Sequence, residues 1–213
     1  VFKVTNSVPI AGFNMEYVNY CWNTNGSKLI YPNFDKLYSI NADGGGLVQL
    51  FQTPNGKFIS ECDWSKDNSQ IAIKVNDLAG YNAEIYVIDM SGTVLYQVLS
   101  GLSGAVSGLS FSVDNQKIAY TRDISGFQNS SYRRLDSRIF IYDRPTALST
   151  ELAVGKPAGF NDYDVKFSPN DAQLIFVNSS NDDISIRNVM TVNVTGAGAR
   201  TVLFAGGSMP EWK

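Results

Sequence analysis

The sequence predicts an all-β protein, a β-propeller of four-stranded antiparallel blades, from a hairpin pattern that occurs four times. Each copy begins with an aromatic residue, continues with a polar turn pair and ends in a short apolar strand. The copies are WNTNGSKLIY (22–31), WSKDNSQIAI (64–73), FSVDNQKIAY (111–120) and FSPNDAQLIF (167–176). Turn pairs such as Asn-Gly and Asp-Asn tolerate the positive φ angles of a tight hairpin turn. Four copies of one hairpin indicate a repeat architecture.

Two further strands follow each hairpin and complete the repeat. The third strand of each copy is an alternating run that ends in Asp or Asn, as in EIYVIDMSG at 84–92, and a fourth apolar segment comes after it. We call the four strands of a unit A, B, C and D. The initial aromatic residues are 42, 47 and 56 residues apart, and four strands per period of this length are typical of propeller blades. The predicted units are 17–53, 60–100, 107–155 and 163–206.

The two ends of the chain carry incomplete repeats. Residues 1–7 are expected to form a D-type strand, and 209–213 the beginning of an A-type strand, within one propeller domain spanning 1–213. Two interpretations follow: a processed or truncated piece of a propeller with about six to eight blades, or four blades that close alone. Open edges in the first case would allow self-association.

The second repeat resembles the TolB-like (WD-like) β-propeller repeat family. The resemblance rests on aromatic-Ser-x-Asp-x-x-x-Ile-Ala followed by Glu-Ile-Tyr-Val-Ile-Asp-x-x-Gly, which residues 64–92 match best. It implies that the aromatic residues, including Trp22, Trp64 and Trp212, pack between neighbouring sheets. It also implies that the B–C and D–A loops share the partner-binding face, in a periplasmic, cell-surface or secreted bacterial protein.

Composition excludes several kinds of chemistry. The chain has no histidine, which removes Ser-His-Asp catalysis, histidine-ligated zinc and the histidine-dependent metal sites of TolB-like polysaccharide lyases. A net charge of −3 does not suit nucleic-acid binding, and no apolar run is long enough for membrane insertion. Acids do precede the A-strand aromatics, at Glu61, Asp63, Asp162, Asp164 and Glu211. We expect them to be solvated rather than a catalytic pair, and therefore predict no enzyme activity, cofactor or metal.

The loop between the B and C strands of the third unit is the strongest candidate for a binding site. It spans 121–138, is the longest in the chain, and carries residue types enriched at interaction hot spots. The alternative is a tolerated insertion that folds over its neighbour. The predicted partner-binding residues are Phe127, Tyr132, Arg133, Arg134, Tyr81, Glu61 and Asp162.

These residues predict a non-enzymatic protein-interaction module that binds a protein partner through the B–C and D–A loop face. One alternative is a carbohydrate-binding propeller that uses Tyr81, Phe127 and Tyr132 as sugar platforms. Another is a non-catalytic gating or substrate-binding domain of a larger hydrolase.

Two smaller features leave alternatives open. Cys21 and Cys62 lie on equivalent A strands and are expected to approach across the first gap between blades, as free thiols rather than as a disulfide. Asp182 and Asp183 form an acidic turn, for which an exposed turn is favoured over a calcium site because a calcium loop needs more oxygen ligands.

Overall fold

The computed structural model describes residues 19–101, 104–126, 135–152, 154–182 and 185–212, and it confirms the predicted propeller blades. Four antiparallel sheets each contain four strands in chain order. The first blade consists of β1 (Cys21–Trp22), β2 (Lys28–Asn33), β3 (Lys36–Asn41) and β4 (Val48–Gln52). The second consists of β5 (Phe58–Trp64), β6 (Gln70–Asn76), β7 (Ala83–Asp89) and β8 (Val94–Leu99).

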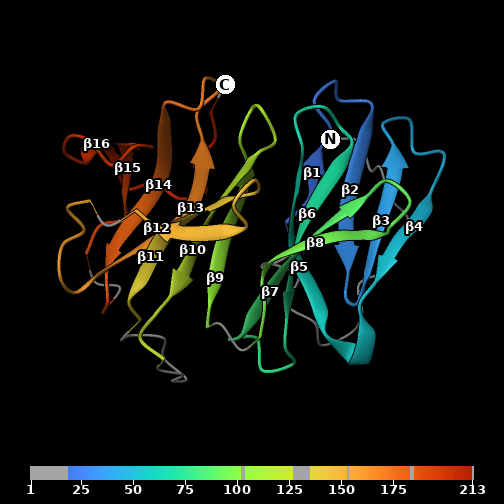
Figure 1. Ribbon diagram of the computed structural model, residues 1–213, viewed down its shortest axis with the longest axis horizontal. Helices are drawn as coiled ribbons and strands as arrows, with labels where there is room; N and C mark the ends of the chain where they lie inside the picture. Colours follow the sequence, from blue (N-terminus) through green and yellow to red (C-terminus); the bar gives the residue numbers. More distant parts are fainter. Residues whose placement is uncertain (1–18, 102–103, 127–134, 153, 183–184, 213) are drawn as a thin grey trace.

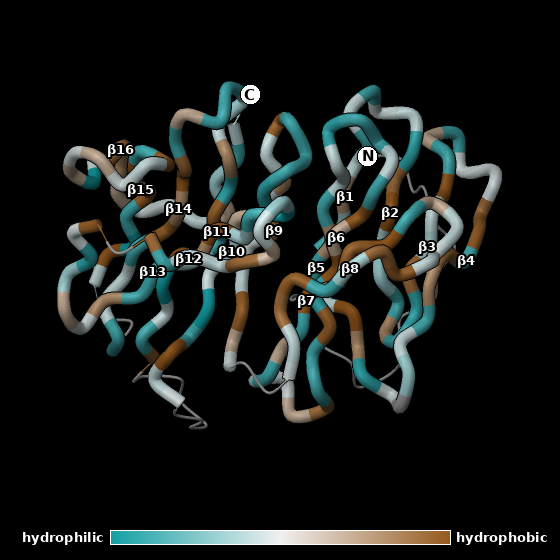
Figure 2. The backbone as a smooth tube through the Cα atoms, viewed as in Figure 1, coloured by the Kyte–Doolittle hydropathy of each residue, from teal (hydrophilic) through white to brown (hydrophobic). Residues whose placement is uncertain are grey.

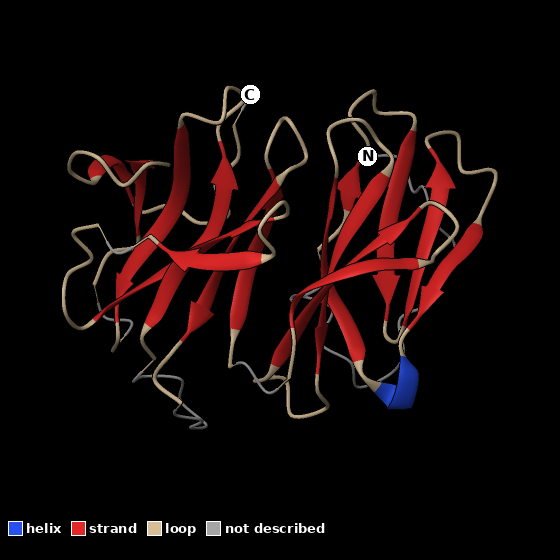
Figure 3. Ribbon diagram, viewed as in Figure 1, coloured by secondary structure: helices blue, strands red, loops and turns tan. Residues whose placement is uncertain are grey.

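The third and fourth blades repeat this order. The third consists of β9 (Val106–Phe111), β10 (Lys117–Asp123), β11 (Ser137–Asp143) and β12 (Leu148–Glu151). The fourth consists of β13 (Phe160–Phe167), β14 (Gln173–Ser180), β15 (Asn188–Asn193) and β16 (Thr201–Ala205). One 3-10 turn, Pro54–Gly56, is the only helical segment in the described ranges (Figure 3).

The blades fan out from neighbouring A strands. Figure 1 shows the first blade at the right and the fourth at the left, with β8 and β12 crossing in front. The inner strands β5 and β9, and then β9 and β13, contact each other across the gaps between blades. The A–B turns gather at the top of this view, and most of the B–C and D–A loops lie in its lower half.

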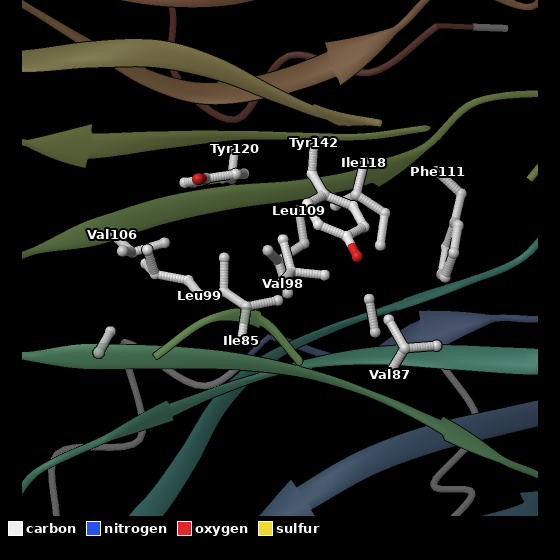
Figure 4. Close-up of a cluster of buried hydrophobic side chains, with 12 residues drawn as sticks. Ile85, Val87, Val98, Leu99, Val106, Leu109, Phe111, Ile118, Tyr120 and Tyr142 are labelled. Carbon is white, nitrogen blue, oxygen red and sulfur yellow. The ribbon is translucent and has the colours of Figure 1, made fainter. Parts of the chain in front are cut away.

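Apolar side chains fill the gaps between blades. They concentrate along the strands, whereas the turns are largely polar (Figure 2). At the junction of the second and third blades, Ile85 and Val87 pack against Leu109, Phe111 and neighbouring residues (Figure 4). Each A-strand aromatic from the second blade onward lies in the gap before its own blade. The fractional exposures are 3% for Trp64, 0% for Phe111 and 6% for Phe167.

The expectation that Trp22 packs in the same way is wrong. Its side chain is 42% exposed, because the described residues include no sheet that covers this face of the first blade. Trp212 does pack, against the fourth-blade residues Ile175, Val177 and Val189, although residues 206–212 pair with no strand in the described part of the chain.

The outer strand of the fourth blade is an exposed apolar edge. The fractional exposures of Val202, Leu203 and Phe204 are 52%, 44% and 54%. Exposed apolar edge strands favour pairing with another chain. Self-association through such an edge stays a prediction.

The turn between strands A and B is held by its own polar side chains. Ser65 Oγ donates to Asp67 Oδ1 over 2.6 Å, and the same bond joins Ser112 to Asp114. The hydrogen bond from Ser65 is the largest of the effects that lower the pKa of Asp67. The Ser-x-Asp pattern of the repeat is therefore a local turn motif.

A second hydrogen bond joins consecutive A–B turns, and we call it the inter-blade latch. In each case an Asn or Asp side chain of one blade accepts a backbone N–H of the preceding blade. The three bonds are Thr24 N–H to Asn68 Oδ1 (2.9 Å), Lys66 N–H to Asn115 Oδ1 (2.7 Å) and Val113 N–H to Asp171 Oδ2 (2.8 Å). The acceptor residues have positive φ angles of 61°, 57° and 56°. Asn and Asp tolerate this backbone conformation better than other side chains do, so each residue closes its turn and holds its neighbour.

The latch does not extend beyond these three junctions. Gly26 occupies the first blade's position equivalent to Asn68 and has no side chain to accept a hydrogen bond. Pro169 occupies the fourth blade's position equivalent to Lys66 and has no N–H to donate.

Replacing Trp64 with Ala should lower the free energy of unfolding by about 3–5 kcal/mol, since a large buried aromatic leaves a cavity between two blades. Urea denaturation measures this effect. Trp22→Ala is the matched control and should cost much less, because that ring is 42% exposed. A Trp64→Ala variant as stable as the wild type would contradict the packing role.

Substitutions at Asp171 should separate the latch from the turn. Asp171→Ala loses the latch and keeps an unfavourable positive φ, so we expect a loss of about 2 kcal/mol. Asp171→Gly loses the latch but adopts this φ freely, so its loss should be about 1 kcal/mol. Equilibrium unfolding of both variants gives the comparison. A glycine variant less stable than the alanine variant would show that the positive φ angle does not account for the extra loss of unfolding free energy expected for alanine.

Candidate functional site

The predicted partner-binding residues fall into two groups. Phe127, Tyr132, Arg133 and Arg134 lie outside the described residues, so their role stays a prediction. Tyr81, Glu61 and Asp162 are described, and the structure does not bring these three side chains together at one surface. The loop itself is shorter than predicted, because β10 extends to Asp123 and β11 begins at Ser137.

Tyr81 is not an exposed loop aromatic, and its prediction as a binding residue is wrong. Its side chain is 4% exposed, and its hydroxyl donates a hydrogen bond to the carboxylate of Asp123, which is 2% exposed. Burial, followed by this carboxylate, raises the pKa of Tyr81 to about 12. The ring links the B–C loop of the second blade to the third blade, which leaves no face for a sugar or a partner.

Asp162 is also a structural residue, and its prediction as a solvated binding residue is wrong. It lies within β13 and is fully buried. Its carboxylate accepts two bonds from the Arg200 guanidinium, at 2.7 and 2.9 Å, and one from Asn178 Nδ2 at 2.8 Å. The Arg200 guanidinium lies over the Phe176 ring, 4.9 Å from its centre. These groups tie strands of the fourth blade together.

Glu61 lies within β5 rather than in a D–A loop, and it is not free. It forms an ion pair with Lys74, whose ammonium also donates to the carbonyl of Val106 over 2.9 Å. Asp164 is affected by this pair, because burial, and then the charge of Glu61, raise the pKa of Asp164. A bulge between Tyr163 and Lys166 separates Asp164 from Asp162, so these two acids have different surroundings.

The described loop face does contain a polar cleft of about 410 Å³. It lies between the end of the B–C loop of the third blade, the D–A loop that follows this blade, and the B–C loop of the fourth blade. The residues that line the cleft include Leu135, Asp136, Arg138, Glu151, Lys156 and Asn181. Leu135 and Asp136 directly follow the segment that contains the predicted loop residues.

The cleft wall is a network of ion pairs. Arg138 Nη2 lies 2.6 Å from Asp136 Oδ2, and Arg138 Nη1 lies 2.8 Å from Glu151 Oε1. Lys156 Nζ lies 2.8 Å from the other oxygen of Asp136 and also donates to the carbonyl of Phe160. The hydrogen bond from Arg138 is the main reason that the pKa of Asp136 falls to about 2. The side chains of Arg138, Asp136 and Glu151 are 36%, 33% and 28% exposed, so their charges face solvent.

Sequence reasoning found one side of this cleft and missed the other. Asp136 and Arg138 fall in the predicted loop at 121–138, but Glu151 and Lys156 were not singled out. The available signal was their position at the end of a D strand and in the D–A loop, on the face expected to bind partners.

The described residues offer no evident metal site. No group of three or more His, Cys, Asp or Glu side chains in these ranges is placed to hold an ion. Asp182 accepts a hydrogen bond from Ser180, whereas Asp183 lies outside the described residues. The described ranges also contain no helix with the length and apolar character needed to cross a membrane.

The low pKa of Asp136 gives the cleft a pH signature. Its folded-state value of about 2 lies below the ordinary value of 3.8, so the ion pairs contribute fully above about pH 4 and are lost as the pH falls towards 2. Asp136→Asn should therefore show a shallower fall in unfolding free energy between about pH 4 and pH 2.5 than the wild type. Urea denaturation across this range measures it, with Asp43→Asn in an exposed turn as the control. Identical slopes for Asp136→Asn and wild type would contradict the ion-pair network.

Comparison with known proteins supports the fold and leaves the function open. No family model matches the chain, and no curated protein matches it in sequence. Solved structures do match. The chain is 16% identical to TolB from Acinetobacter baumannii, with a TM-score of 0.68, over 88% of this chain and 44% of that one.

Two further solved structures match the chain. An oligogalacturonate lyase in complex with manganese matches with a TM-score of 0.66 and 10% identity, over 87% of this chain and 52% of that one. A nidogen/laminin complex matches with a TM-score of 0.63 and 13% identity, over 87% and 64%. The chain thus spans 44% to 64% of the length of these three structures. At such low identity the matches establish architecture alone, and the four blades have the TolB-like β-propeller fold.

Proposed function

We propose that this chain is a non-enzymatic protein-interaction module that binds a protein partner through its B–C and D–A loop face. The observation that carries the proposal is the 410 Å³ polar cleft, which the third and fourth blades form together on that face. Three loops converge there, and one of them is the longest in the sequence. Loops held by a rigid scaffold are common positions for binding residues.

The charges of the cleft suit recognition of a polar partner. Ion pairs between partly exposed side chains contribute little to stability, so they are inexpensive to rearrange. Arg138 presents a planar guanidinium that can bind a partner carboxylate through two hydrogen bonds, and Glu151 can accept from a partner Arg or Lys. Such complementary charges favour specificity and fast association.

The absence of an enzymatic function is part of the same proposal. The chain contains no histidine, so it lacks the commonest general base. Two of the five acids that precede the A-strand aromatics are held in ion pairs: Asp162 with Arg200, and Glu61 with Lys74. The match to a lyase does not oppose this, because a shared fold does not imply a shared activity.

The proposed location is the periplasm, the cell surface or the exterior of a bacterium. The TolB-like fold and the structural match to TolB support it. The match to a nidogen/laminin complex supports protein binding by this architecture. The carbohydrate alternative is weakened because Tyr81 is buried, and a role as a non-catalytic domain of a larger hydrolase stays a prediction.

The test is a charge reversal in the cleft. Partners are captured from bacterial envelope extract with the wild type, identified by mass spectrometry, purified and titrated. Glu151→Lys should weaken binding of the purified partner tenfold or more, about 1.4 kcal/mol, because it places a cation beside Arg138 and Lys156. Its unfolding free energy should change by less than about 1 kcal/mol, since the residue lies at the surface.

The matched control is Asp43→Lys. This substitution makes the same charge change as Glu151→Lys. It lies in the exposed C–D turn of the first blade, on the opposite face of the propeller. It should leave the affinity within about twofold. Equal affinities for both variants would exclude the cleft as the binding site. Capture of a polysaccharide in place of a protein would favour the carbohydrate alternative.

A further inference from the structure

The two cysteines of the chain meet at the first junction between blades. Cys21 comes from β1 and Cys62 from β5, and 41 positions separate them in the sequence. Their Sγ atoms lie 3.2 Å apart, and both are free thiols. A disulfide bond has a length of about 2.05 Å, so closure needs the two sulfur atoms to approach by about 1.2 Å.

The surroundings hold both thiols in this arrangement. Cys62 is 1% exposed and packs in the apolar cluster that contains Ile30 and Trp64. The indole N–H of Trp64 donates to the carbonyl of Cys21 over 3.2 Å, which fixes the backbone of β1 against the second blade. Cys21 is only partly buried whereas Cys62 is buried, so Cys21 is the more accessible residue of the pair. This hydrogen bond and the shared packing therefore hold the two cysteines as neighbours at the first junction.

We propose that Cys21 and Cys62 are a redox modification site that forms a reversible disulfide between the first and second blades. The oxidant is a disulfide, either a small molecule or a thiol–disulfide oxidoreductase. The Cys21 thiolate attacks one sulfur of the oxidant, which forms a mixed disulfide and releases the first thiol. The Cys62 thiolate then attacks Cys21 Sγ and releases the second thiol. Two cysteine thiols are oxidised, one external disulfide is reduced to two thiols, and the two cysteine protons pass to the departing thiolates.

The bond would act on the weakest strand pairing of the first blade. Within the described residues, β1 contains two residues and pairs with β2 through Cys21 and Trp22. Without the disulfide, this segment is held to the second blade by the indole hydrogen bond, by a backbone hydrogen bond from Asn19 N–H to the Ser60 carbonyl (2.9 Å), and by packing at the first junction. A covalent link to β5 would hold it on the second blade even when its pairing with β2 opens. Burial, and then the adjacent Cys62, raise the pKa of the Cys21 thiol, which lowers its thiolate fraction and slows its attack on an oxidant.

The experiment uses the intact chain, purified in reductant and then equilibrated in glutathione buffers of increasing oxidised fraction. Free thiols are labelled with a maleimide in urea, and intact mass and peptide mapping locate adducts and crosslinks. We expect the wild type to pass from two maleimide adducts to none, with a Cys21–Cys62 crosslinked peptide in a monomeric chain. Its melting temperature should rise by about 5–10 °C on oxidation.

The cysteine variants are the controls. Cys62→Ser should retain glutathione on Cys21, because no second thiol resolves the mixed disulfide. The double variant with serine at both positions should melt at the same temperature in reduced and oxidised buffer. The proposal is overturned if the fully oxidised wild type keeps two free thiols, retains glutathione on Cys21, or forms crosslinks between chains.

Discussion

Each blade of this protein has two apolar faces, and neither face can be buried within its own sheet. The structure therefore depends on the contact between neighbouring blades. Trp64, Phe111 and Phe167 each fill the gap before their own blade, and the burial of such rings is among the largest stabilising contributions in a small protein. The hydrogen bonds of the latch then fix the rotation of one blade against the next. Trp22 has no such neighbour in the described chain, and its side chain is exposed.

This arrangement also decides where chemistry can occur. Strand direction alternates within every blade, so all the B–C and D–A loops emerge at one end of the propeller, as the lower part of Figure 1 shows. The polar cleft lies at that end, at the junction of the third and fourth blades. The thiol pair lies at the first junction. Both features need two blades, so neither site is contained in a single repeat.

Most of the fold could be predicted from the sequence, because its determinants are local. The strand alternation and the Ser-x-Asp turns each act over a few residues. The regular return of an aromatic residue then shows that the same local pattern is repeated along the chain. The status of the polar side chains could not be predicted, because it depends on partners that lie far away in the sequence. Asp162 is paired with an arginine 38 positions later, and Tyr81 donates a hydrogen bond to a carboxylate 42 positions later. Glu151 and Lys156 gain their role only where two loops meet, and no short motif marks such a meeting.

The inter-blade latch has a consequence for how this chain can change length. The second and third blades each carry both halves of the latch, a backbone N–H donor and an Asn acceptor. A tandem duplication of either unit would therefore give a new blade that already fits its neighbours on both sides. The outer two blades lack this property, since Gly26 offers no acceptor and Pro169 no donor. Among these four blades, duplication of the second or third unit is therefore the route that keeps a latch on both sides of the new blade.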